Sequence, residues 1–160
     1  MQEFEKPRIL KLMNDSPTSR ALREKLAASG ALLFSVGLVT GFWSAAALTG
    51  MVQVEMPRLA LAAHLNGLFG GLWLLAVAFT LEYLAYSEKQ KKILSFLVII
   101  PSWANWGVTL IASFWGVNGL SFTSDLHNNL IAVLLQLFVV LPSVIAGIYW
   151  VRGFYLRKTI

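Results

Sequence analysis

The chain of 160 residues has no cysteine and few charged residues. The absence of cysteine excludes disulfides, zinc–thiolate centres, iron–sulfur clusters and catalytic thiols. Charged residues make up 13% of the chain, whereas a soluble domain of ordinary composition has about 25%. Hydrophobic residues make up 57%, which also excludes an intrinsically disordered chain.

Charged residues are missing altogether from four long stretches, which are 26–54, 59–81, 93–124 and 126–151. A helix needs about 20 apolar residues to cross the hydrocarbon core of a bilayer. The sequence therefore predicts an all-α integral membrane protein, a four-transmembrane-helix bundle in up-down-up-down order that forms a single domain over residues 1–160. The predicted spans are 27–48, 58–84, 93–116 and 126–151, and residues 1–15 are predicted to lie on the membrane surface.

The positive charges lie almost entirely on one side of this predicted bundle. Of the 13 Lys and Arg residues, all but Arg58 lie before the first span, between the second and third, or after the fourth. The positive-inside rule then predicts that both termini are cytoplasmic. A basic rim facing anionic lipid accounts for the net charge of +5 without a nucleic-acid partner. We expect a multi-pass protein of the inner (cytoplasmic) membrane.

Two prolines mark predicted helix starts. Asp15 or Ser16, followed by Pro17, is typical of an N-cap with proline at the first helical position, and Pro57 is placed to begin the second span. In the first span Gly37 and Gly41 form a small-xxx-small pair, which permits close helix packing or self-association.

His64 is the only titratable side chain well inside a predicted span, roughly 9 Å from its outer end at about 1.5 Å per residue. A hydrogen bond between helices is one interpretation of such a histidine. Gly67 and Gly71 share its helix face, so a flat porphyrin could lie against this strip with the imidazole bound to its iron. Glycine strips also serve helix packing, and the spacing alone leaves both interpretations open.

A second polar group lies in the third span. Asn105 and Thr109 are one turn apart on one helix face, and Asn105 lies roughly 12 Å below the outer end, near the expected depth of His64. With Trp103 and Trp106 as walls, these residues predict a pocket for a small aromatic molecule in the outer half of the bundle. The alternative is that Asn105 only bridges two helices.

The outer end of the fourth span is also polar. His127, Asn128 and Asn129 follow Asp125 and are interpreted as an interfacial helix cap, with a second heme ligand at His127 as the alternative. Tryptophans near the span ends are predicted to be interfacial anchors, namely Trp43, Trp115 and Trp150.

Several short motifs in the first three spans resemble those of hydroxylaminobenzene mutase, a small membrane enzyme that rearranges hydroxylaminobenzene to 2-aminophenol. The motifs are Gly37-Leu38-Val39-Thr40-Gly41, Ala63-His64-Leu65-Asn66-Gly67, Trp103-Ala104-Asn105-Trp106 and Trp115-Gly116. The chain is also similar to styrene oxide isomerase, a four-helix membrane enzyme that binds heme b through a histidine of its second helix and works as a trimer.

This resemblance implies that His64 is the axial iron ligand of heme b. The spacing of Gly67 and Gly71 on the same helix face makes them the candidates to lie beside this cofactor. The resemblance implies that Asn105 orients the oxygen of a small aromatic substrate. Thr109 is a further catalytic candidate because it shares the helix face of Asn105. The resemblance also implies a homo-oligomer, specifically a trimer.

Two departures from styrene oxide isomerase bear on the reaction. Thr109 stands where that enzyme has a tyrosine, and Gly70 stands where it has an asparagine. These differences favour the mutase reaction over the rearrangement of an epoxide to an aldehyde.

The leading hypothesis is an intramolecular rearrangement assisted by ferric heme as a Lewis acid, in an aromatic pocket without charges. Asn105 and Asn66 are expected to hydrogen-bond the departing oxygen, although Asn66 lies about 200° around the helix from His64. The alternatives are epoxide rearrangement, an electron-transfer anchor that binds heme b through His64 and His127, and a non-enzymatic membrane scaffold or carrier.

Overall fold

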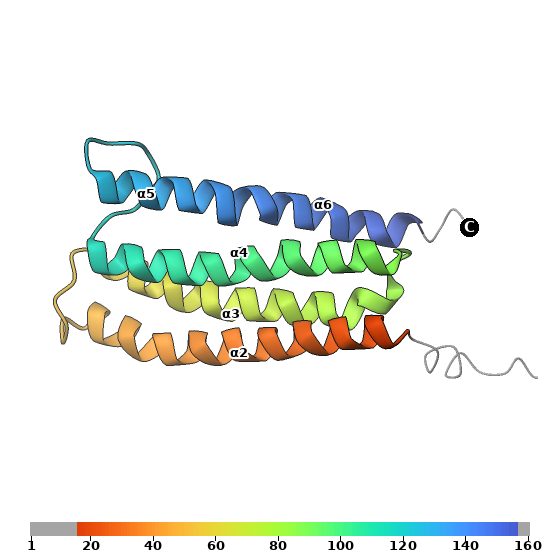
Figure 1. The fold of residues 1–160 in the computed structure, drawn as a ribbon. Helices are drawn as coiled ribbons and strands as arrows, with labels where there is room; N and C mark the ends of the chain where they lie inside the picture. The colour runs from red at the N-terminus through yellow and green to blue at the C-terminus, as the bar shows by residue number, and fades with distance from the viewer. Residues whose placement is uncertain (1–15, 157–160) are drawn as a thin grey trace, which may run out of the picture.

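The computed structural model describes residues 16–156, which form four long helical segments (Figure 1). Each segment is long and apolar enough to cross a membrane, which confirms the four predicted spans. The elements are α2 (Pro17–Leu48), α3 (Pro57–Thr80) with the 3₁₀ turn η1 (Leu81–Tyr83), α4 (Glu88–Trp115), α5 (Leu126–Leu134), the π-helix η2 (Leu135–Val140) and α6 (Leu141–Tyr155). The predicted surface segment 1–15 lies outside the described residues.

The helix starts follow the local sequence signals. The Ser16 side chain accepts a hydrogen bond from the Ser19 N–H at 3.1 Å, so Ser16 is the N-cap of α2, and α3 begins at Pro57 as predicted. The third helix begins five residues earlier than predicted, at Glu88, because Ser87 and Gln90 form a capping box.

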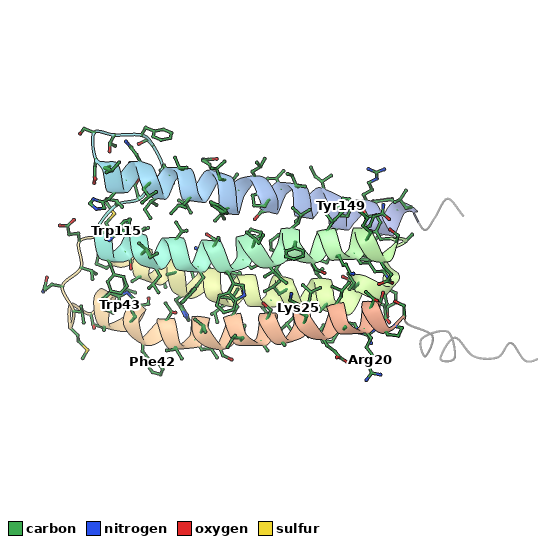
Figure 2. The ribbon with its side chains drawn as sticks, viewed as in Figure 1. Arg20, Lys25, Phe42, Trp43, Trp115 and Tyr149 are labelled. Atoms are coloured by element: carbon green, nitrogen blue, oxygen red, sulfur yellow. The ribbon has the colours of Figure 1, made fainter. Side chains whose placement is uncertain are left out.

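Successive segments run in opposite directions and pack in chain order (Figure 1). The most extensive interface joins α2 to α3, α4 packs against α3, and α6 packs mainly against α4. Arg20 and Lys25 lie toward one end of the bundle, whereas Trp43 and Trp115 lie toward the other (Figure 2). The assignment of these ends to the two sides of a membrane stays a prediction.

Helices α2 and α3 touch through their backbones. A Cβ atom added to Gly67 would lie 2.6 Å from the Cα of Gly37, and one added to Gly71 would lie 2.8 Å from the Gly30 carbonyl oxygen. Real Cβ atoms do not approach other heavy atoms so closely, so the contact requires glycine on both helices.

The end of the bundle that carries the α3–α4 turn is held by polar contacts. Arg23 of α2 forms an ion pair with Glu82 at 2.9 Å. The Tyr86 hydroxyl donates to the Tyr149 carbonyl oxygen at 2.6 Å, and the Trp150 indole donates to the Thr80 hydroxyl at 2.9 Å. The ion pair joins α2 to the turn after α3, and the two hydrogen bonds attach α6 to the rest of the bundle at this end.

The fourth span contains a change of helix type that the sequence analysis did not predict. In η2 the N–H of Leu141 bonds to the carbonyl of Gln136, which is the five-residue spacing of a π-helix. Helix α4, by contrast, continues through Pro101.

We predict that Gly67→Ala destabilises the bundle by about 2 kcal/mol, because overpacking a tight contact typically costs about 1 to 3 kcal/mol. Gly107→Ala is the matched control, since a Cβ at Gly107 meets no atom within 4 Å. The control is expected to be neutral or up to about 1 kcal/mol more stable, as alanine favours helix over glycine. Thermal unfolding in detergent measures both, and equal stability of the two variants would contradict the backbone contact.

Candidate active site

Three polar side chains meet between α3 and α4. The side-chain N–H₂ of Asn66 donates to Asn105 Oδ1 at 3.1 Å and to Thr109 Oγ1 at 3.0 Å. Asn105 and Thr109 are one turn apart on α4, as their spacing predicted. The structure thus brings together Asn66, Asn105 and Thr109, which we call the amide network.

The amide network borders a cavity of about 250 Å³ between α3, α4 and α6, which we call the asparagine cavity. Its lining residues are Asn66, Phe69, Gly70, Trp73, Pro101, Ser102, Asn105 and Ser143. A cavity of about 150 Å³ can hold benzene, so there is room here for one substituted aromatic ring. No lining residue is ionisable.

The network determines which polar groups remain for a ligand. Both N–H bonds of Asn66 are used inside the network, which leaves its Oδ1 as an acceptor. Asn105 accepts through Oδ1, which leaves its N–H₂ as a donor. The asparagine cavity therefore offers one acceptor and one donor side by side, a pattern that matches a group with both an N–H or O–H and a free oxygen lone pair.

Ser143 is a lining residue that the sequence analysis missed. It contributes from α6, directly after Pro142, and its hydroxyl adds a further polar group to the cavity wall. A single serine in an apolar span does not indicate a binding site by itself. The π-helix before it also changes the helix face on which Ser143 lies, which helical spacing in the sequence does not reveal.

His64 lies on the other side of α3, against α2. Its Nδ1 is 2.8 Å from the Gly37 carbonyl oxygen, and a Cβ at Gly41 would lie 3.0 Å from the ring. Because a carbonyl only accepts, Nδ1 carries the proton in this contact, and Nε2 keeps a lone pair. Nε2 makes no hydrogen bond within the described part of the chain. The sequence analysis predicted one pocket that contains the His64 imidazole, the Asn105 amide and the Thr109 hydroxyl. In the structure the imidazole lies apart from the other two groups, because His64 and Asn66 are two residues apart and therefore face about 200° away from each other around α3.

The glycine strip beside His64 is occupied by α2. Gly67 and Gly71 are buried against the backbone of that helix, so no ring system fits between them and α2 in this arrangement. Of the two interpretations that the spacing left open, helix packing describes this strip.

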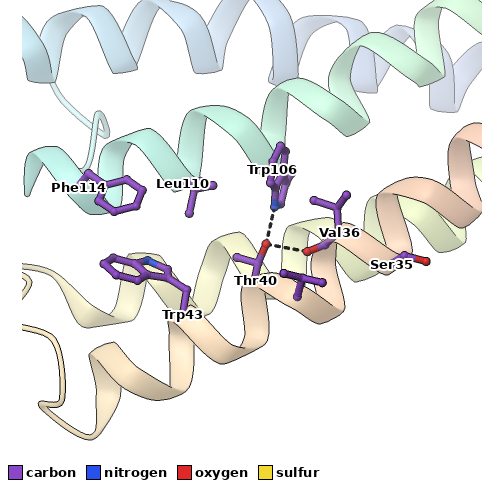
Figure 3. Close-up of a pocket in the computed structure, with 8 residues that line it drawn as sticks. Ser35, Val36, Thr40, Trp43, Trp106, Leu110 and Phe114 are labelled. Carbon is purple, nitrogen blue, oxygen red and sulfur yellow. Dashed lines mark hydrogen bonds between the residues drawn. The ribbon is translucent and has the colours of Figure 1, made fainter.

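A second and larger cavity of about 460 Å³ lies between α2 and α4 (Figure 3). Its lining residues are Ser35, Val36, Val39, Thr40, Trp43, Trp106, Leu110 and Phe114, and we call it the tryptophan cavity. The Trp106 indole donates to the Thr40 hydroxyl at 3.0 Å, and Trp43 packs on Phe114 with ring centroids 4.7 Å apart. Trp43 therefore lines a cavity as well as lying near a span end. Trp103 does not line this cavity, and its indole donates to the Ser29 hydroxyl at 2.9 Å.

The polar residues at the start of α5 serve the outer loop. The Asp125 side chain caps the helix at the His127 N–H, and Asn128 bonds to Gly119 and to the Ser121 carbonyl. The His127 ring packs on Trp115 at 4.9 Å. Its described contacts are those of a helix cap, and none of them joins it to His64.

Four helices that are long and apolar enough to cross a membrane, with an uncharged polar cavity between them, are typical of a small multi-pass membrane protein. The sequence profile of the styrene oxide isomerase family matches residues 22–155. The chain belongs to this family.

The chain is similar to two hydroxylaminobenzene mutases. The chain is 32% identical over 102 residues to hydroxylaminobenzene mutase HabB of Ectopseudomonas oleovorans, a match over 64% of this chain and 58% of that protein. It is 34% identical over 92 residues to hydroxylaminobenzene mutase HabA of the same organism, over 57% of this chain and 62% of that protein. The chain thus spans about three fifths of the length of each relative.

Proposed function

We propose that this protein is a membrane-embedded isomerase that converts hydroxylaminobenzene to 2-aminophenol. The observation that carries the proposal is the amide network at the wall of the asparagine cavity, which offers an acceptor and a donor beside aromatic side chains. The names of two relatives support this choice of reaction.

The substrate fits the polar pattern of the cavity. A hydroxylamine carries N–H and O–H donors and an oxygen that accepts, so it pairs with Asn66 Oδ1 and with the Asn105 N–H₂ at once. Its phenyl ring is apolar and suits the faces of Phe69 and Trp73. A charged substrate would have no counter-ion among the lining residues.

The rearrangement is a redox-neutral isomerisation. The N–O bond breaks heterolytically, the oxygen forms a C–O bond at the ortho carbon, and the proton lost from that carbon ends on nitrogen. The Asn105 N–H₂ stabilises negative charge on the departing oxygen and keeps it near the ring. Phe69 and Trp73 present negative π faces to the electron-poor ring and exclude water that would compete as a nucleophile. Thr109 acts as a positioning residue because it fixes the orientation of Asn66.

Heme b belongs to the proposal as the cofactor that the family resemblance implies. The side chain that fits it is His64, since its Nδ1–H bond to a backbone carbonyl orients the ring and leaves Nε2 for iron. Gly67 and Gly71 do not offer a surface for the macrocycle within one chain, because α2 covers them. When bound, ferric heme would supply Lewis acidity toward a hydroxylamine or epoxide oxygen, although within one chain His64 faces away from the asparagine cavity.

The remaining expectations are part of the same proposal. Cytoplasmic termini and an inner-membrane location are supported by Arg20, Arg23 and Lys25 at one end of α2, where the helix is polar. A homo-oligomer is supported by the exposed apolar face of the fourth span, which only α4 covers extensively.

Rearrangement of styrene oxide to an aldehyde is the second candidate, favoured by the family profile. An epoxide has an acceptor oxygen and no N–H or O–H, so it uses the Asn105 donor and leaves Asn66 Oδ1 unpaired. One assay with both substrates therefore decides between them, and turnover of styrene oxide alone would overturn the mutase proposal.

We expect Asn105→Leu to lower kcat/KM for hydroxylaminobenzene by about 100-fold, the typical effect of removing one donor to a developing oxyanion. Thr109→Val should lower it by about 10-fold, since it acts only through Asn66. Asn118→Ala, in the exposed outer loop, is the matched control with unchanged activity. Rates of Asn105→Leu within about threefold of the parent protein would contradict the assigned role.

We expect protein purified after expression with heme supplied to show a Soret band. His64→Ala should lose this band, and His127→Ala should retain it, because the His64 ring lies inside a span and is oriented by the Gly37 carbonyl, whereas His127 is exposed at the start of α5. An unchanged band in His64→Ala would exclude His64 as the ligand. Optical absorption reads out binding independently of activity.

A further inference from the structure

The tryptophan cavity takes no part in the mechanism above. Helix α4 faces it with Trp106, Leu110 and Phe114, which are spaced four residues apart (Figure 3). Asn105 precedes Trp106 by one position and therefore faces about 100° away, toward the asparagine cavity. The two cavities thus lie on neighbouring faces of one helix.

One polar atom in the tryptophan cavity has no partner. The hydroxyls of Ser35 and Thr40 donate to backbone carbonyls at 2.9 and 2.8 Å, and the Trp106 indole donates to Thr40. The Trp43 Nε1–H is buried and makes no hydrogen bond within the described residues. Buried donors are almost always paired in folded proteins, so this one calls for an acceptor that residues 16–156 do not supply.

The remaining lining determines the kind of acceptor. Three aromatic rings, those of Trp43, Trp106 and Phe114, form much of the wall, and no lining residue is charged. The wall therefore suits a neutral aromatic ring and offers nothing to an ion. The volume of about 460 Å³ exceeds the roughly 150 Å³ that holds benzene, so a substituted ring fits.

The cavity opens on the outer surface of the α2–α4 pair. Val39 is 66% exposed and Phe114 is 60% exposed, and both lie on its rim. In a membrane-spanning bundle this surface meets the hydrocarbon core, where apolar compounds concentrate. A neutral aromatic molecule dissolved in lipid therefore reaches the cavity sideways, without passing through water.

We propose that the tryptophan cavity is a second binding site, which takes a neutral monocyclic aromatic compound from the lipid and holds its acceptor oxygen with the Trp43 Nε1–H. Its place beside the asparagine cavity makes it a capture site for the substrate, an assignment that rests on the proposed function. Binding itself does not depend on that function, because it follows from the lining alone.

The test uses the full chain labelled with 5-fluorotryptophan in detergent micelles. Fluorine resonances of Trp43 and Trp106 are assigned with Trp43→Phe and Trp106→Phe, and that of Trp73 with Trp73→Phe. The probes are acetophenone, which has an acceptor oxygen, and isopropylbenzene, which replaces that oxygen with a methyl group. Affinities are expressed per mole fraction of probe in the micelle, so that partitioning does not enter the comparison.

We expect saturable shifts of the Trp43 and Trp106 resonances, with acetophenone bound about fivefold more tightly than isopropylbenzene because of one hydrogen bond. In Trp43→Phe, followed through Trp106, the two probes should bind equally. Val39→Phe, which fills the rim, should weaken both probes and serves as the second variant if Trp43→Phe does not fold.

Three results would overturn the proposal. The first is the absence of any saturable shift at Trp43, and the second is a shift at Trp73 alone, which would place the probe only in the asparagine cavity. The third is failure of nitroxide-labelled lipid to broaden the Trp43 resonance, which would show that another copy of the chain covers the rim. A chain that binds the probes but lacks mutase activity would refute the proposed function and leave the binding site standing.

Discussion

The backbone contact between Gly37 of α2 and Gly67 of α3 determines how the rest of the bundle is arranged. At this separation no side chain lies between the two helices, so the side chains on either flank of the contact are brought near the opposite backbone. On one flank His64 reaches the Gly37 carbonyl. On another, the Trp106 ring from α4 lies 3.1 Å from the position of a Cβ on Gly67, and its indole reaches Thr40 on α2. The contact between Trp106 and Thr40 in the tryptophan cavity and the orientation of the His64 imidazole thus both depend on the absence of side chains at Gly37 and Gly67.

Helix α3 carries an imidazole on one face and an amide on another. His64 faces α2 and presents one free ring nitrogen, while Asn66 faces α4 and forms the amide network. The cavity beside that network contains amides and hydroxyls but no ionised group, so its hydrogen bonds act in a low dielectric and are not weakened by charge screening. An uncharged lining also offers no counter-ion to a protonated ligand.

Local sequence signals predicted the number of spans, the cap at Ser16 and the shared face of Asn105 and Thr109, because each depends on residues within one or two turns. The partner of each face could not be predicted, since helical periodicity gives the direction of a side chain but not the helix that covers it. The glycines at 67 and 71 show this limit: their spacing suits a flat cofactor as well as another backbone. Trp43 is a second example of this limit, because its position near a span end predicts an interfacial anchor, whereas in the structure it lines the tryptophan cavity.

The irregular turn in the fourth span adds one residue to a helix without adding a loop. A π-helical turn of this kind is equivalent to a single insertion, so every side chain after it is rotated by about 100° relative to an unbroken α-helix. With that rotation Ser143 lines the asparagine cavity, and the carbonyl of Tyr149 and the indole of Trp150 meet Tyr86 and Thr80. One residue more or fewer within 135–140 would turn a different face of the last helix toward the asparagine cavity. The glycine contact lies between α2 and α3, so it does not depend on this part of the chain.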